Sequence, residues 1–177
     1  GSVSPTTAEH VLAEFTPDQL LVLDGGPCRV GIESTVLRLD PPTVLRPGAV
    51  LRAELEAVLG CPVGLLEGSR ESPGQLERHY APATPALRCR AWDWPELRRL
   101  HPAGVAVLGV QPPTPPPDEF FPLSDDPAAY AAGLYAELRR ADRSGASLIV
   151  VLEPDRPGGL WDAVRDRLRR ATRLFGA

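Results

Sequence analysis

Hydroxyl and guanidinium groups gather in one glycine-bounded stretch in the first third of the sequence. Ser34 and Thr35 lie in a run of β-branched and aliphatic residues, 31–39, and Arg46 follows a second such run, 43–45. The two runs predict two strands with a proline-containing break between them. Hydroxyl groups and a forked cation suit an oxyanion such as a carboxylate or a phosphate. A plain β-hairpin with a polar face and a surface arginine fits the same residues, so the pattern alone leaves both interpretations open.

The elements that would position these groups follow from hydrophobic spacing and from helix-capping residues. A helix is predicted to begin at Ser4-Pro5-Thr6, because serine is a favourable N-cap and proline fits the first helical turn. A short buried strand is predicted at 19–23, and an amphipathic helix is predicted after Gly48 and ending at Gly60. A weaker apolar run at 63–66 predicts another strand.

Residues 68–85 differ in character from the rest of the chain and predict a linker. The segment is rich in Gly, Ser and Pro and has little hydrophobic periodicity. Its middle, 72–82, nevertheless carries charged and aromatic side chains, among them His79 and Tyr80. So many functional side chains are unusual for a spacer, and the sequence leaves a plain linker and a functional segment as alternatives.

From Ala86 onward strand and helix patterns alternate, which predicts a small α/β layer around a mostly parallel sheet. Strands are predicted at 86–89, 104–110, 120–123 and 147–152, and helices at 94–100, at 126–141 and after Gly159. In such folds ligands bind where strands end and helices begin, and the loop 153–159 lies at such a place. The loop lacks a Gly-x-Gly-x-x-Gly, which favours a plain connection over a second nucleotide site.

Composition argues against several classes of function. The chain has 177 residues, a net charge of −4 and 43% hydrophobic residues, which is typical of a globular protein and not of a nucleic-acid-binding protein. Arg165, Arg169 and Arg173 share one side of the last helix with acidic residues, which favours a solvated face over RNA binding. Three scattered cysteines and three scattered histidines show no zinc-ligand spacing and indicate a reducing compartment, and no apolar run reaches membrane-spanning length.

The beginning of the chain predicts a missing upstream part. The sequence contains no methionine, and it starts neither with a signal peptide nor with a transit sequence. We therefore expect the chain to be the C-terminal portion of a longer, cytoplasmic protein.

Four motifs taken together resemble the threonylcarbamoyl-AMP synthase family in its longer, two-domain form. They are Ser4-Pro5-Thr6, Gly31 to Val36, Leu45 to Gly48 and Ser72 to Pro82. The last third of the chain matches more loosely, through Gly159-Leu160 and Asp166-Arg167-Leu168. The resemblance implies three parts: the C-terminal part of a YrdC-like α/β catalytic domain at 1–67, a linker or lid at 68–85, and an accessory Rossmann-like parallel-sheet domain at 86–177.

The resemblance also implies a reaction and a set of site residues. Enzymes of that family combine L-threonine, bicarbonate and ATP into threonylcarbamoyl-adenylate and release pyrophosphate, with Mg²⁺ bridging the phosphates. Partner proteins then transfer the threonylcarbamoyl group to an adenosine beside the anticodon of certain tRNAs. Ser34 would bind L-threonine, Ser4 and Arg46 would contact ATP, and Tyr80 would close over the nucleotide, while His79 would add either a polar contact or structural support. No protein nucleophile is implied, and we expect no direct contact with nucleic acid and no membrane association.

One departure from the family pattern limits the expected activity. The family carries a phosphate-binding strand rich in Lys and Arg, and this chain contains no lysine. We therefore expect this chain alone to be unable to make the adenylate. A non-catalytic regulatory module that binds a nucleotide or a partner protein is the alternative hypothesis. A carbamoyltransferase relative acting on another acceptor is a third, and the 72–82 motif argues against it.

Overall fold

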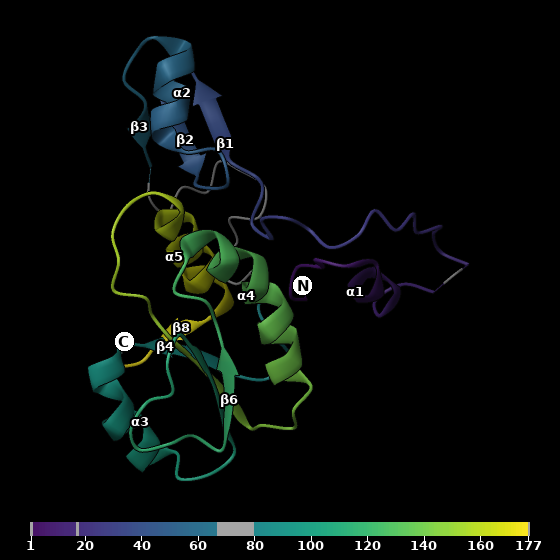
Figure 1. Cartoon of the computed structure of the whole chain (residues 1–177), viewed down its shortest axis with the longest axis vertical. Coiled ribbons are helices and arrows are strands. Elements are labelled where there is room, and N and C mark those ends of the chain that lie inside the picture. The colour runs from purple at the N-terminus through teal and green to yellow at the C-terminus, as the bar shows by residue number, and fades with distance from the viewer. Residues whose placement is uncertain (1, 17, 67–79, 177) are drawn as a thin grey trace.

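The computed structural model describes residues 2–16, 18–66 and 80–176, and within them the chain forms two separate sheets. Figure 1 shows a small lobe around the first sheet, a larger lobe around the second, and an N-terminal arm that carries α1 (Ala8–Leu12). Most of the 72–82 motif, His79 included, lies outside the described residues.

The small lobe is built on the predicted hairpin. β1 (Val36–Leu39) pairs antiparallel with β2 (Pro42–Arg46), β3 (Gly64–Leu65) pairs parallel with β2, and α2 (Arg52–Leu59) connects β2 to β3. The first strand is shorter than the predicted 31–39, because the segment before Val36 lies against the large lobe instead of joining the sheet. α2 ends as predicted at Gly60, whose φ of 68° is in the left-handed region that favours glycine.

The large lobe is an α/β domain with helices on both faces of a parallel sheet. The strand order is β6-β5-β7-β4-β8, with bounds β4 (Ala86–Cys89), β5 (Val105–Gly109), β6 (Glu119–Pro122), β7 (Leu148–Leu152) and β8 (Arg173–Leu174). One face is covered by α3 (Trp94–Leu100), which follows the 3-10 turn η1 (Ala91–Asp93), and the other by α4 (Pro127–Asp142) and α5 (Leu160–Ala171). The expected α/β class is confirmed, and β8 is the strand of this sheet that the sequence analysis did not predict.

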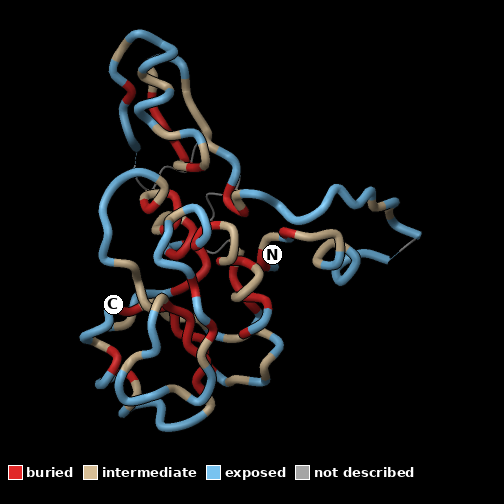
Figure 2. The backbone as a smooth tube through the Cα atoms, in the orientation of Figure 1, coloured by how far each residue is buried: buried red, intermediate tan, exposed pale blue. Residues whose placement is uncertain are grey.

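Successive side chains of the central strands point to opposite faces of the sheet, which divides the core into two clusters. Val105 and Val107 of β5 pack with α3, whereas Ala106 and Leu108 pack with α4 and α5. Figure 2 shows that buried residues are concentrated in this lobe, while the arm is mostly exposed. The large lobe therefore supplies the rigid platform of the molecule.

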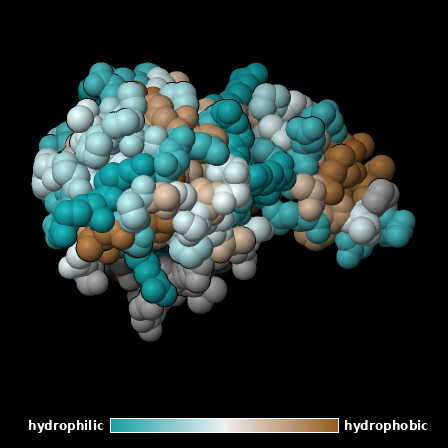
Figure 3. Space-filling model, turned by 90° about the horizontal axis from the view of Figure 1, so that it is seen from below, coloured by the Kyte–Doolittle hydropathy of each residue, from teal (hydrophilic) through white to brown (hydrophobic). Residues whose placement is uncertain are grey.

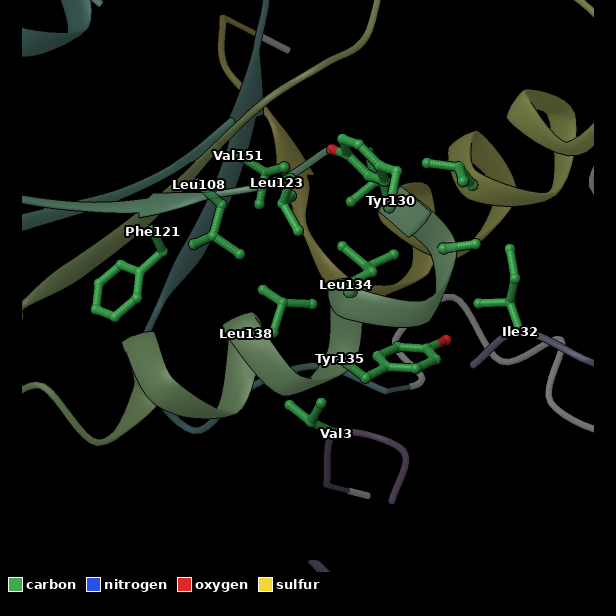
Figure 4. Packing of buried hydrophobic residues seen from close by; sticks show 14 of the residues in the cluster. Val3, Ile32, Leu108, Phe121, Leu123, Tyr130, Leu134, Tyr135, Leu138 and Val151 are labelled. Atoms are coloured by element: carbon green, nitrogen blue, oxygen red, sulfur yellow. The ribbon is translucent and has the colours of Figure 1, made fainter. Parts of the chain in front are cut away.

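α4 is the central helix of the larger cluster. Its N-terminus is capped by Asp126, whose side chain accepts hydrogen bonds from the N–H groups of the first helical turn. Tyr130 and Tyr135 are both buried on this helix, and Figure 4 shows their hydroxyl groups pointing away from one another. Val3 and Ile32 pack into the same cluster, so the N-terminal part of the chain is joined to the large lobe.

Two predictions about the N-terminal arm are wrong. α1 begins after Thr7, whose side chain accepts a hydrogen bond from the His10 N–H, and not at Ser4. The predicted buried strand at 19–23 has no regular structure, and Leu21 and Leu23 are 87% and 86% exposed. Neither sheet of the described chain includes a strand that pairs with this segment, so nothing there covers its apolar side chains.

Candidate functional site

Ser34 lies in a short segment held between the two lobes. At Gly31, with a φ of 74°, a Cβ would come within 2.7 Å of the Ala131 carbonyl oxygen of α4, so only glycine allows this approach. The Thr35 hydroxyl donates to the Val50 carbonyl at 2.9 Å, which attaches the other end of the segment to the small lobe. The segment is thus fixed at both ends, and Ser34 itself is exposed.

The Ser34 backbone is contacted from two directions. On the small-lobe side, a Cβ at Gly48 would lie 2.3 Å from the Ser34 carbonyl oxygen, so the two backbones are in close contact. On the other side, Arg167 of α5 donates from Nη2 to the Ser34 carbonyl oxygen at 3.2 Å. Arg167 is only 3% exposed, so the guanidinium that makes this charge-assisted hydrogen bond is buried.

Asp166 pairs with two buried arginines of α5. Its carboxylate pairs with Arg167 and accepts two hydrogen bonds from Arg170, from Nε at 3.0 Å and from Nη2 at 2.8 Å. The Asp166 hydrogen bonds raise the pKa of the Arg170 guanidinium. One carboxylate therefore holds two cations in place beside the Ser34 segment.

Tyr135 of α4 is where the lobes and the end of the linker meet. The Tyr80 ring lies 5.5 Å from the Tyr135 ring, centroid to centroid, with 48° between the planes. Burial raises the pKa of Tyr135; the charges of Arg167 and Arg46 oppose this rise, and those of Tyr80 and Asp166 add to it. Arg46, from β2 of the small lobe, is therefore within electrostatic reach of the same tyrosine as Tyr80. We call the six residues Arg46, Tyr80, Tyr135, Asp166, Arg167 and Arg170 the interface cluster.

The backbone of Tyr80 is unusual. Its φ of 62° is in the left-handed region, and within the described chain no other residue except glycine has a positive φ. Such a conformation persists only where surrounding contacts hold it, and the Tyr135 ring supplies one of them. Tyr80 is thus held against α4 in this structure.

Ser4, in the N-terminal segment, lies against the same helix one turn further along. Its carbonyl oxygen is 3.5 Å from Nε of Arg139, which also bonds to the Val3 carbonyl and pairs with Glu14. Arg139 follows Tyr135 by four residues, so the two side chains share one face of α4. The four predicted site residues Ser4, Ser34, Arg46 and Tyr80 therefore all border the α4–α5 pair.

The sequence analysis did not assign Tyr135, Arg167 or Arg170 to the site. A signal was available in the helical spacing of α5, because Arg167 and Arg170 follow Ala163 at four and seven residues. That spacing places both arginines on the buried stripe of the helix, where an unaccompanied charge would be costly. A buried arginine on an apolar stripe indicates a fixed partner, and here the partners are Asp166 and the Ser34 carbonyl.

A cleft beside these residues offers room for a ligand. It has a volume of about 290 Å³ and lies between the start of α2 and the start of α5, with Gly48 and Arg52 on one side and Gly159 and Asp162 on the other. Among residues 2–16, 18–66 and 80–176 no group of three or more His, Cys, Asp or Glu side chains could hold a metal ion. In the same part of the chain no helix has both the length and the apolar character needed to cross a membrane.

Comparison with known proteins points to one family. A family model described as "Threonylcarbamoyl-AMP synthase, C-terminal domain" matches residues 50–172. The threonylcarbamoyl-AMP synthase of Pyrococcus abyssi is 33% identical over 187 aligned positions, which include 97% of this chain and 55% of that protein. The protein of the same name from Bacillus subtilis is 34% identical, with coverage of 97% and 54%. The chain thus spans about half the length of the curated relatives it matches.

Solved structures agree with this result. The crystal structure of P. abyssi Sua5 complexed with L-threonine superposes with a TM-score of 0.84 at 32% identity, covering 98% of this chain and 56% of that one. A structure of the same protein in which consecutive histidine and tyrosine residues are replaced by alanine gives a TM-score of 0.82.

Proposed function

Because the chain belongs to the threonylcarbamoyl-AMP synthase family, we propose that it forms part of an enzyme that joins L-threonine, bicarbonate and ATP. The reaction joins the threonine nitrogen to the bicarbonate carbon and that carboxyl group to the α-phosphate. The products are threonylcarbamoyl-AMP, pyrophosphate and water. Downstream proteins would then pass the threonylcarbamoyl group to tRNA, which makes this cytoplasmic enzyme part of tRNA modification. The L-threonine complex of the P. abyssi protein supports the choice of amino acid.

Ser34 is the proposed contact to L-threonine. Its backbone is fixed by Gly48 and Arg167, while the residue itself is exposed, so its hydroxyl can hydrogen-bond to the carboxylate or ammonium group of an amino acid. A group that is held before the substrate arrives loses little entropy on binding, and this favours a positioned substrate over a loosely bound one.

Arg46 and Ser4 are the proposed contacts to ATP. Formation of the adenylate develops negative charge on the α-phosphate and on the departing pyrophosphate, and a fixed guanidinium stabilises such charge. Arg46 ends β2 immediately before Pro47-Gly48, which line the cleft between the lobes. No protein nucleophile is needed, because the bicarbonate-derived carboxyl group on the threonine nitrogen attacks the α-phosphorus directly and displaces pyrophosphate.

Tyr80 is the proposed closing residue. Threonylcarbamoyl-AMP is a mixed anhydride that water hydrolyses, so a ring covering the nucleotide would protect it. The Tyr80 side chain packs against Tyr135 within the interface cluster. Residues 79–80 are the only His-Tyr dipeptide of this sequence. The histidine–tyrosine variant of the P. abyssi protein makes the same pair of residue types a reasonable target here.

Magnesium would be held by ATP more than by this chain. Mg²⁺ prefers oxygen ligands and often binds through substrate phosphates with one or two carboxylates. When bound, the ion would neutralise phosphate charge, and Arg46 would contribute to the same end.

The observation that carries the proposal is the convergence of residues from three separate stretches. Ser34 is tied to α5 through Arg167, Arg46 of the small lobe lies within electrostatic reach of Tyr135, and the Tyr80 ring packs against the Tyr135 ring at a tilt of 48°. These are the residues to which the motifs assign threonine, ATP and closure. A chance set of surface residues would not share one helix pair.

We further propose that this chain alone is not a competent enzyme. Large apolar side chains of the N-terminal arm are exposed, among them Leu12, Phe15, Leu21 and Leu23, and Figure 3 shows apolar surface at this end of the molecule. Surface of this kind is typical of a contact with another part of a protein. The relatives are about twice as long, and a further part of the protein would cover the arm and complete the threonine and phosphate pockets.

The test measures pyrophosphate release in this chain and in a version extended to the length of the relatives. The extended protein should release pyrophosphate only when L-threonine, bicarbonate and ATP are all present, and the 177-residue chain should not. Arg46→Gln should reduce the rate in the extended protein at least tenfold, whereas Arg99→Gln, an exposed arginine of α3 that does not line the cleft, should leave it within twofold. Threonine-independent release, or equal rates for the two variants, would exclude the proposal, and no release from the extended protein would favour a non-catalytic module.

A further inference from the structure

A second crevice, of about 330 Å³, opens at the carboxyl edge of the large sheet and shares no residue with the interface cluster. It lies between the residues that follow β4 and those that follow β7. These strands are neighbours, yet the chain after β4 leads to α3 on one face and the chain after β7 leads to α5 on the other. In parallel α/β sheets such a switch point is where ligands bind, and the volume is near the lower limit of about 300–1,000 Å³ for ligand pockets.

The rim of the crevice carries an exposed aromatic ring next to a cation. Trp92 is 62% exposed, and the Arg90 guanidinium carbon lies 5.0 Å from the centroid of its ring. Arg90 makes no ion pair with any described residue, and its guanidinium makes a cation–π contact with the Trp92 ring. An exposed indole binds planar aromatic groups by stacking, and a neighbouring guanidinium binds an anion attached to them.

Cationic donors and carboxylate acceptors also line the crevice. Arg165 donates to the Arg156 carbonyl and pairs with Asp162, which leaves further N–H donors on its guanidinium. Glu153 is already paired with Arg88 at 3.1 Å. The crevice therefore combines a stacking surface, cationic donors and one further carboxylate, that of Asp155, for which no hydrogen bond or ion pair occurs among the described residues.

We propose that this crevice is a nucleotide site of the accessory domain, separate from the proposed catalytic site, and that it binds a nucleoside monophosphate. The base stacks on Trp92, the phosphate binds to Arg90 and Arg165, and the ribose hydroxyls donate to the Asp155 carboxylate. Each of these groups lines the crevice, and each matches one part of the ligand.

Calorimetric titration of the 177-residue chain with AMP tests the proposal. Adenosine and inorganic phosphate should each bind at least tenfold more weakly than AMP, because each makes only part of the contacts. Trp92→Ala should raise the Kd at least about tenfold, equal to about 1.4 kcal/mol. Trp92→Phe, which keeps a stacking ring, should stay within threefold of the unaltered chain. Far-ultraviolet circular dichroism should show all variants folded, because residue 92 is on the surface.

Three further variants separate this crevice from the proposed catalytic site. Arg90→Gln should weaken AMP binding severalfold, whereas the exposed Arg99→Gln of α3, which does not line the crevice, should leave it unchanged. Arg46→Gln should also leave it unchanged. The proposal is overturned if AMP does not bind at millimolar concentration, if Trp92→Ala binds AMP as the unaltered chain does, or if Arg46→Gln abolishes binding while Trp92→Ala preserves it.

Discussion

Replacing Arg167 by methionine should destabilise the chain more than any surface arginine substitution does. Arg167 is buried on α5, bonds to the Ser34 carbonyl at 3.2 Å and pairs with Asp166. Methionine keeps much of the side-chain volume and removes the charge. Asp166 keeps its two hydrogen bonds to Arg170, so the substitution does not leave a buried carboxylate without a counter-charge.

The expected cost follows from the contacts that are lost. A hydrogen bond to a charged group contributes about 1.5–3 kcal/mol, so we expect Arg167→Met to lower the free energy of unfolding by about 2–3 kcal/mol. Asp166→Asn should cost more, about 3–5 kcal/mol, because two buried guanidinium groups lose their shared carboxylate. The exposed Arg169→Met on the same helix should change the free energy by less than about 0.5 kcal/mol.

Urea unfolding followed by far-ultraviolet circular dichroism measures these differences. With an m-value of about 2 kcal/mol/M, the Arg167→Met midpoint should fall by about 1 M. The result that would refute the reasoning is a midpoint for Arg167→Met equal to that of Arg169→Met, or a smaller loss for Asp166→Asn than for Arg167→Met. Either would mean that the lobes are not held together by these α5 contacts.

Three further outcomes are expected. Gly145→Ala should lower the free energy of unfolding by about 1–2 kcal/mol, because its φ is positive and the space around it is open. Gly31→Ala should cost the same amount plus a penalty for the contact of the new Cβ with the α4 backbone. Equal urea midpoints for the two variants would contradict this. The hydrogen bond from Arg98 lowers the pKa of Asp118 to about 2, so the stabilisation it gives is present above its ordinary pKa of 3.8 and is lost as the pH falls toward 2. Asp118→Asn should remove that part of the acid dependence in a pH series of unfolding curves. Burial raises the pKa of the Cys89 thiol to about 12, so at about pH 8 it should react with a thiol reagent only after unfolding, and rapid labelling in the folded chain would show that it is not buried.

Much of the large lobe could be predicted because its signals are local. The apolar runs that became β5 and β7 are buried on both faces, as expected for inner strands of a parallel sheet, and Asp126-Pro127 fixed the start of α4. Gly60 likewise fixed the end of α2 through its left-handed backbone. In each case the residues that determine the element lie within it or next to it.

The parts that could not be predicted depend on distant partners. Residues 19–23 have the composition of a strand, but a strand also needs a neighbour, and neither sheet of the described chain supplies one. Both Ser4 and Thr7 are good N-caps, and contact of the 3–4 segment with Arg139 of α4 fixes that segment outside the helix. The pairing of Arg167 with Ser34 joins residues that are 133 positions apart, which no local pattern could reveal.

The site residues predicted from motifs border α4 and α5, but the motifs do not identify the residues that hold them in place. Ser34 comes from the segment between the lobes and Arg46 from the small lobe. Ser34 contacts α5, and Arg46 is within electrostatic reach of Tyr135 on α4. The large lobe is therefore a structural neighbour of the proposed substrate site. We expect substitutions in the interface cluster to affect substrate binding as well as stability.

The most direct test of the account is a pair of Michaelis constants, measured by pyrophosphate release in the protein extended to the length of its relatives. Ser34→Ala should raise the KM for L-threonine at least tenfold and leave the KM for ATP within twofold. Arg46→Gln should do the opposite, raising the KM for ATP at least tenfold with little change for L-threonine. If both variants changed both constants equally, or changed neither, Ser34 and Arg46 would not be the separate threonine and ATP contacts that the account requires.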